Sequence, residues 1–119
     1  MSKKEIATTN ALTQPRVQEG STITIPRRTV FCLIWEESER GWGVRPDGYS
    51  FHRTEADARA YVDDYWKTMP DSAPDEYERP SSSTLYTYDV EEKVFRDVSK
   101  SKNGIRVGRS AVRGDLRRA

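Results

Sequence analysis

The sequence is poor in the side chains that carry most enzyme chemistry. Its 119 residues include one cysteine, Cys32, and one histidine, His52. A single cysteine excludes an intramolecular disulfide and a multi-cysteine zinc site. Cys32 lies in the apolar run 30–35, where free cysteine is typically a small buried residue, and this is consistent with a reducing, cytoplasmic compartment.

Long apolar runs and phosphate-binding glycine motifs are also missing. No stretch approaches the roughly 18 apolar residues of a membrane span, and no apolar region follows the N-terminus as in a secretory signal. Walker-type, dinucleotide and Gly-x-Ser-x-Gly patterns do not occur. We therefore expect a non-enzymatic protein with no membrane contact, no cofactor and no metal site.

Carboxylates are plentiful, so a metal-dependent hydrolase is the alternative among enzymes. They occur largely as adjacent pairs such as Asp63-Asp64. Neighbouring positions do not share a helix face, so such pairs are typical of a solvated surface. A hydrolase would need several acids to converge on a divalent cation.

The charge is nearly balanced overall but is divided into blocks. The formal net charge of +1 is the sum of +3 over residues 1–35, −8 over residues 36–97 and +6 over residues 98–119. An acidic body with a basic tail indicates either a charged partner or a tail that folds back on its own body.

Periodicity and turn residues predict a small α+β domain. We expect strands over 21–25, 29–36, 41–45, 49–52, 84–88 and 105–107, and helices over 54–68 and 90–100. The strands form a mostly antiparallel sheet of four to five strands, packed by one main helix and a second, C-terminal helix. For residues 90–100 the helix is favoured, and a hairpin with 93–98 as its second strand is the rival.

Local motifs refine this outline. Pro46-Asp-Gly48 predicts the turn of a hairpin between 41–45 and 49–52. Thr54 is a good N-cap for the main helix, and Asn103-Gly104 fits a left-handed cap after the second. We expect a flexible arm over 1–20, one domain over 21–107 with a long loop at 70–83, and a basic flexible tail over 108–119.

Two groups of residues are candidates for contact with a partner protein. The first surrounds the predicted hairpin, where tryptophan and arginine are the residue types that dominate interface hot spots, and the second lies in the long acidic loop. The alternative interpretation is that Trp42 is a core residue and that His52 has a structural role. The candidates are Trp42, Arg45, Tyr49, His52, Arg53, Asp75, Glu76 and Tyr77.

The basic C-terminal region is the candidate for nucleic-acid binding. Closely spaced cations on an unstructured chain neutralise phosphates and give salt-sensitive binding. Tyr86 and Tyr88 share one face of a strand, where they either stack on bases or form part of the core. The cations are Lys100, Lys102, Arg106, Arg109, Arg113, Arg117 and Arg118.

Residues 47–61 (DGYSFHRTEADARAY), 69–71 (MPD) and 74–80 (PDEYERP) resemble segments of small accessory proteins of phages and other mobile elements. The resemblance covers residues 30–107. It implies an accessory factor made inside a bacterial cell, where such factors bind and redirect or block host machinery, including defence nucleases. We therefore expect a non-catalytic module that binds and modulates a host protein, and the alternative is a nucleic-acid-binding protein that uses the basic tail.

Overall fold

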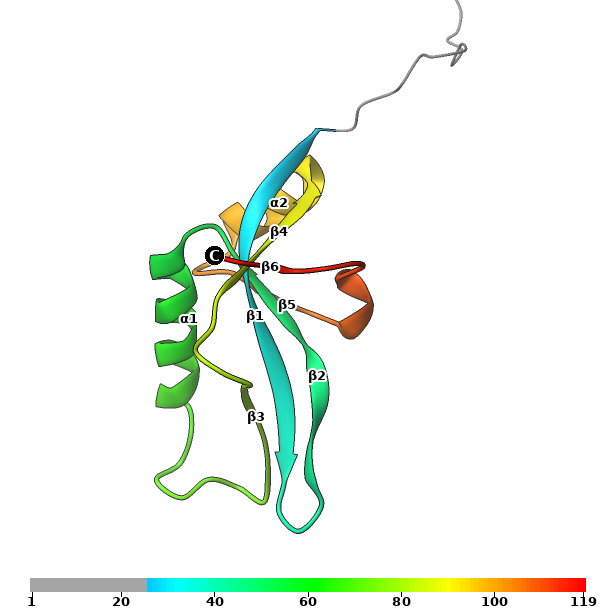
Figure 1. Cartoon of the computed structure of the whole chain (residues 1–119). Coiled ribbons are helices and arrows are strands. Elements are labelled where there is room, and N and C mark those ends of the chain that lie inside the picture. The colour runs from blue at the N-terminus through cyan, green and yellow to red at the C-terminus, as the bar shows by residue number, and fades with distance from the viewer. Residues whose placement is uncertain (1–25) are drawn as a thin grey trace, which may run out of the picture.

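A single long strand organises the computed structural model, which describes residues 26–119. This strand, β1, takes part in three of the five strand pairings of the sheet (Figure 1). The elements are β1 (Arg27–Glu39), β2 (Gly43–His52), α1 (Glu55–Lys67), β3 (Glu76–Pro80), β4 (Tyr86–Glu91), α2 (Glu92–Lys100), β5 (Ile105–Val107), the 3-10 turn η1 (Arg109–Ala111) and β6 (Arg117–Arg118).

The sheet has six strands, and every pairing is antiparallel. The order is β5-β2-β1-β4-β6, and β3 also pairs with β1. On one edge of β1, β4 pairs with residues 27–32 and β3 pairs with residues 35–39. The expected α+β fold, a mostly antiparallel sheet with a main helix and a C-terminal helix, is confirmed.

The hairpin between β1 and β2 turns earlier than predicted. The chain reverses at Gly41-Trp42, where Gly41 (φ +85°) and Gly43 (φ +98°) take up backbone conformations that favour glycine. The predicted turn at residues 46–48 is wrong, because these residues lie inside β2. There they form a β-bulge in which Trp35 pairs with Gly48, and proline and glycine are tolerated at such an irregularity.

Both helices agree with the sequence in type. At α1 the Asp57 N–H donates to the Thr54 hydroxyl at 3.0 Å, so the predicted N-cap is confirmed. α2 is a helix and not the second strand of a hairpin, and it begins only at Glu92 because residues 86–91 belong to β4. Asn103 (φ +63°) and Gly104 (φ +132°) have the predicted positive φ angles, but they do not cap α2, because its C-cap is Ser101 in an extended conformation (φ −88°, ψ 142°).

The two faces of the sheet carry separate cores. One face holds Leu33 and Trp35 against α1, and we call this cluster the α1 core. The other face lies under α2 and the C-terminal segment 108–119, and we call this cluster the α2 core. Alternation along β1 explains the division, because successive side chains point to opposite faces. The buried members of the α2 core are Val30, Cys32, Phe51, Val90 and Val98.

Two segments predicted to lack regular structure are part of the fold. β3 lies within the predicted loop 70–83. The predicted flexible tail contains η1 and β6, and its Val112 and Leu116 pack against the α2 core. The Tyr88 hydroxyl accepts from the Arg113 N–H at 2.9 Å, which anchors this segment. The expected arm at 1–20 and strand at 21–25 lie outside the described residues.

We expect Gly104→Ala to lower the free energy of unfolding by about 3 kcal/mol. A methyl group there would lie 2.3 Å from His52 Nδ1 and 2.4 Å from the Phe51 carbonyl oxygen, on a backbone that alanine adopts only with strain. Gly108→Ala is the matched control, because its surroundings are open and its φ is −78°. Urea unfolding that shows equal stabilities for the two variants would contradict this packing.

Candidate functional site

A chain of buried polar groups links β1, β2 and the turn before β5. The Trp35 indole N–H donates to Ser50 Oγ at 2.7 Å, and Ser50 Oγ lies 2.7 Å from His52 Nε2. His52 Nδ1 lies 2.6 Å from the Asn103 carbonyl oxygen, which can only accept. His52 therefore carries its proton on Nδ1, and the Ser50 hydroxyl donates to Nε2.

This serine–histidine pair is placed to support the fold and not to attack a substrate. Ser50, His52 and Trp35 are all 0% exposed, so no substrate reaches the hydroxyl. Burial lowers the pKa of His52, and the hydrogen bond to the Asn103 carbonyl opposes that shift only in part. Burial likewise raises the pKa of the Cys32 thiol to about 12, so its thiolate is not formed at neutral pH.

Arg106 closes the end of the α1 core. Its guanidinium lies 4.5 Å above the Trp35 ring and bonds to Asp47, at 2.8 Å, and to Glu78. Asp47 is the extra residue of the β2 bulge, so the bulge aims its carboxylate at Arg106. These contacts join β2, β3 and β5. They also engage Arg106, which the sequence had suggested as a nucleic-acid-binding residue.

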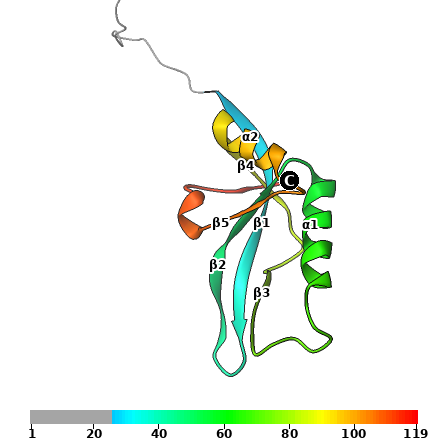
Figure 2. The same cartoon turned by 180° about the vertical axis from the view of Figure 1, so that it is seen from behind.

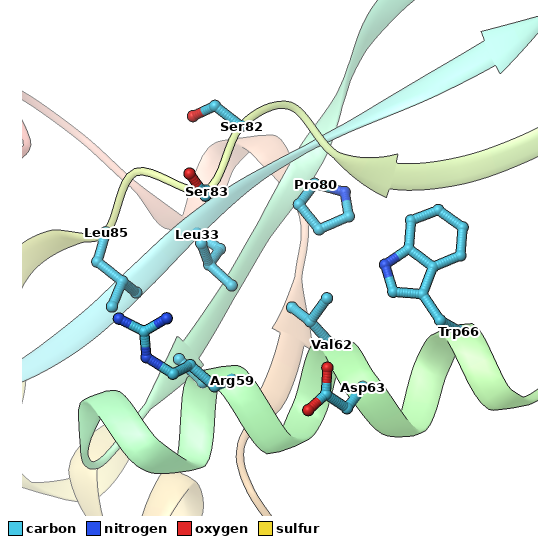
Figure 3. A pocket seen from close by; sticks show the side chains of 10 residues that line it. Leu33, Arg59, Val62, Asp63, Trp66, Pro80, Ser82, Ser83 and Leu85 are labelled. Atoms are coloured by element: carbon cyan, nitrogen blue, oxygen red, sulfur yellow. The ribbon is translucent and has the colours of Figure 1, made fainter.

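A groove of about 490 Å³ lies beside α1, between the helix and the connection from β3 to β4 (Figure 3). Trp66 and Pro80 stand at one end, and Arg59 and Leu85 lie toward the other. The lining is apolar at its base and polar at its rim. It consists of Leu33, Ala58, Arg59, Val62, Asp63, Trp66, Pro80, Ser82, Ser83 and Leu85.

The groove has the size and lining of a contact site. Its volume falls in the ordinary range for a binding pocket, and its base is made of aliphatic side chains. The polar residues of the lining are Arg59, Asp63, Ser82 and Ser83. Trp66 remains 41% exposed in the groove, and Asp63 makes no ion pair with another described residue.

A second exposed region lies at the tip of the β1–β2 hairpin. Trp42 is 84% exposed there, so it belongs to neither core. Arg45 pairs with Glu37 across the strands at 3.0 Å. Arg40 pairs with Asp75 at 3.2 Å, and its N–H donates to the Asp75 carbonyl, which holds the start of β3 against the tip.

The predicted protein-contact residues divide between this tip and the interior. Trp42 and Arg45 lie at the tip, and Asp75, Glu76 and Tyr77 lie opposite residues 38–40. Tyr49 packs against the α2 core and His52 is buried, so these two were placed wrongly. Arg53 is exposed near the start of α1, where it pairs with Asp57 at 3.9 Å.

The predicted nucleic-acid residues also need revision. Arg106 is engaged as described, and Lys102 pairs with Asp64 at 3.8 Å. Tyr86 and Tyr88 pack against the α2 core, where Tyr88 stacks on Phe51 with ring centroids 5.9 Å apart, so neither is a platform for bases. The remaining predicted cations are exposed.

The groove was missed because it depends on the distance between separate segments. Ala58, Val62 and Trp66 are spaced four residues apart along α1, and such a spacing of apolar residues is typical of a stripe that faces the core. Only Ala58 is fully buried, whereas Val62 is partly buried and Trp66 is 41% exposed. The exposed tryptophan at the end of the stripe was the available signal.

Among residues 26–119, no group of three or more histidine, cysteine, aspartate or glutamate side chains is arranged to hold a metal ion. Within the same part of the chain, no helix is long and apolar enough to cross a membrane. Comparison with family models, curated proteins and solved structures returned no match.

We expect the folded-state pKa of His52 to lie below 6.5, and the protein to lose stability as the pH falls through that value. The unfolded chain takes up a proton near pH 6.5, whereas the buried imidazole resists it, so protonation favours unfolding. His52 is the only histidine, so its NMR signal is unambiguous. A folded-state titration midpoint above 6.5, with stability rising toward acid, would contradict its burial.

Trp35 and Trp42 should differ sharply in their contribution to the free energy of unfolding. Trp42→Ala should change the free energy of unfolding by no more than about 0.5 kcal/mol, because the side chain is 84% exposed. Trp35→Ala should cost about 4 kcal/mol or prevent folding, because it opens a cavity and removes the donor to Ser50. Equal losses in denaturant unfolding would show that Trp42 is packed.

Proposed function

We propose that this chain is a non-catalytic binding module that engages a partner protein through the groove beside α1. The observation that carries this proposal is the combination of an aliphatic base, a half-exposed tryptophan wall and a polar rim. Apolar pockets bordered by polar groups are typical of contact sites for a partner's anchor side chain.

The residues available for chemistry support a contact role. The only histidine and the only cysteine are both fully buried, and each is held neutral at physiological pH by burial. The exposed carboxylates in the described part of the chain are dispersed, and many of them face arginines. A partner protein could bind these carboxylates, whereas no activated nucleophile is available to react with a substrate.

The groove also suggests the chemistry of the partner. A bulky apolar side chain fits against Val62 and Leu85, and a neighbouring basic side chain would meet Asp63. Trp42 at the hairpin tip offers a second anchor. β3 lies between this tip and the groove, because it pairs with the end of β1 and its Tyr77 ring contacts Trp66. Tryptophan is among the residue types that contribute most to interfaces.

The resemblance to phage accessory proteins suggests the setting. In that setting the module acts in the cytoplasm of a bacterial host, where it binds and modulates or inhibits a host protein such as a nucleic-acid enzyme or a component of a defence system. Occupying an apolar groove requires no reaction, so inhibition by contact needs no cofactor.

Affinity capture with two helix variants tests the proposal. We expect the tagged chain to retain a stoichiometric protein from nuclease-treated bacterial lysate, and Trp66→Glu to lose it, because a carboxylate in the groove wall opposes an apolar anchor. Ala56→Glu is the matched control, because it adds the same charge to the same helix at an exposed position outside the groove. The variants' circular dichroism melts verify folding.

Two outcomes would reject the proposal. The first is that no stoichiometric protein is retained by the wild-type chain. The second is that a retained protein binds Trp66→Glu as tightly as it binds the wild type in calorimetry with purified components.

A further inference from the structure

Most cations of the described chain fall into two groups. Those with at least one ion pair to a carboxylate are Arg28, Arg40, Arg45, Arg53, Arg59, Lys67, Arg79, Lys102 and Arg106. Arg27 is in neither group, because its guanidinium donates to the Asp89 carbonyl oxygen at 2.8 Å. The cations of α2 and of the C-terminal segment differ, because they are exposed and pair with no described carboxylate. These are Lys93, Arg96, Lys100, Arg109, Arg113, Arg117 and Arg118, which we call the basic surface.

The basic surface is built on an ordered scaffold, mostly on one side of the sheet; Arg117 and Arg118 are successive residues of β6 and therefore point to opposite faces. Val94 of α2 and Val112 of the C-terminal segment pack against the same core, on the face of the sheet opposite α1. β6 pairs with β4, and the Tyr88 hydroxyl holds the Arg113 backbone. Figure 2 shows η1 on the far side of the sheet from α1. The cations are therefore presented by folded segments.

Few opposing charges lie within this surface. Glu92 is engaged by Arg28 at 3.3 Å, and Asp89, which lies near Arg113 and Arg117, accepts a hydrogen bond from the Thr29 hydroxyl at 2.8 Å. Asp97 and Asp115 are the other carboxylates of these segments. Concentrating like charges works against the compact state, whereas most other cations of the described chain pair with carboxylates. A polyanion would neutralise the basic surface, and release of the polyanion's counterions would drive the binding.

We infer that the basic surface binds the phosphate backbone of double-stranded nucleic acid without reading its sequence. The choice of a duplex follows from the aromatic residues. Tyr86 and Tyr88 pack against the α2 core, and Phe95 lies under the Arg28 guanidinium at 3.9 Å, so these rings are unavailable for stacking on unpaired bases. A duplex offers the higher density of phosphate charge.

Fluorescence anisotropy with the full chain and a labelled, random-sequence DNA duplex of about 20 base pairs tests this inference. With about five phosphate contacts, the affinity should fall roughly a hundred- to thousand-fold between 50 and 200 mM salt. Single-stranded oligo-dT of the same length should bind more weakly than the duplex. Polyglutamate, a protein-like polyanion, should also bind more weakly.

Matched charge reversals locate the contact. The double variant Arg96→Glu/Lys100→Glu should weaken duplex binding at least about tenfold near 100 mM salt and reduce the slope of the salt dependence by about 2. The control Arg53→Glu/Lys67→Glu changes the net charge equally at exposed positions near the two ends of α1, and it should retain nearly all the affinity. Thermal melts of both variants verify that they fold.

The inference is overturned if the duplex does not bind at 50 mM salt, if both double variants lose affinity equally, or if oligo-dT or polyglutamate binds more tightly than the duplex. The assay uses only the purified chain and DNA. Its outcome is therefore separate from that of the groove experiment, in which nuclease treatment removes nucleic acid.

Discussion

The indole of Trp35 occupies the point at which four segments of the protein meet. Its N–H begins the hydrogen-bonded chain through Ser50 and His52 to the turn before β5, and its ring contacts α1 edge-on through Tyr61 and Tyr65. A buried donor without an acceptor would cost about 1–3 kcal/mol, so each group in this chain fixes the place of the next. Because Trp35, Ser50 and His52 are fully buried, the sheet, the helix and the turn before β5 cannot shift independently.

Both proposed contact surfaces follow from this arrangement. Tyr61 and Tyr65 hold one side of α1 against Trp35, so Val62 and Trp66 on the adjoining side face the β3–β4 connection across a groove. The bond from His52 to the Asn103 carbonyl fixes the turn that leads from α2 into β5. That turn directs the following segment across the opposite face of the sheet, where it packs against the same core as α2. One face of the sheet thus supports an apolar groove and the other supports a basic surface.

Much of the fold could be predicted from the sequence, and little of the site could. The helical periodicity of the apolar residues and the N-cap Thr54 predicted α1. The strand at 29–36 was found because its run of apolar residues is strong. β3 was missed because 76–80 is charged and is held by backbone pairing with β1 rather than by burial. The C-terminal segment was interpreted as mobile because only two widely spaced apolar residues anchor it. The groove and the ion-pair partners of the cations depend on distances between remote segments, which a linear pattern does not contain.

The direction of the hydrogen bonds around Trp35 is the claim on which this account rests. The tautomer of His52 reports that direction, because the Asn103 carbonyl can accept only from a protonated Nδ1. Nitrogen-15 NMR of the imidazole at neutral pH measures it directly. The account predicts one fixed tautomer, with the proton on Nδ1 and a bare Nε2 that accepts from Ser50. A proton on Nε2, or an average of the two tautomers, would contradict it.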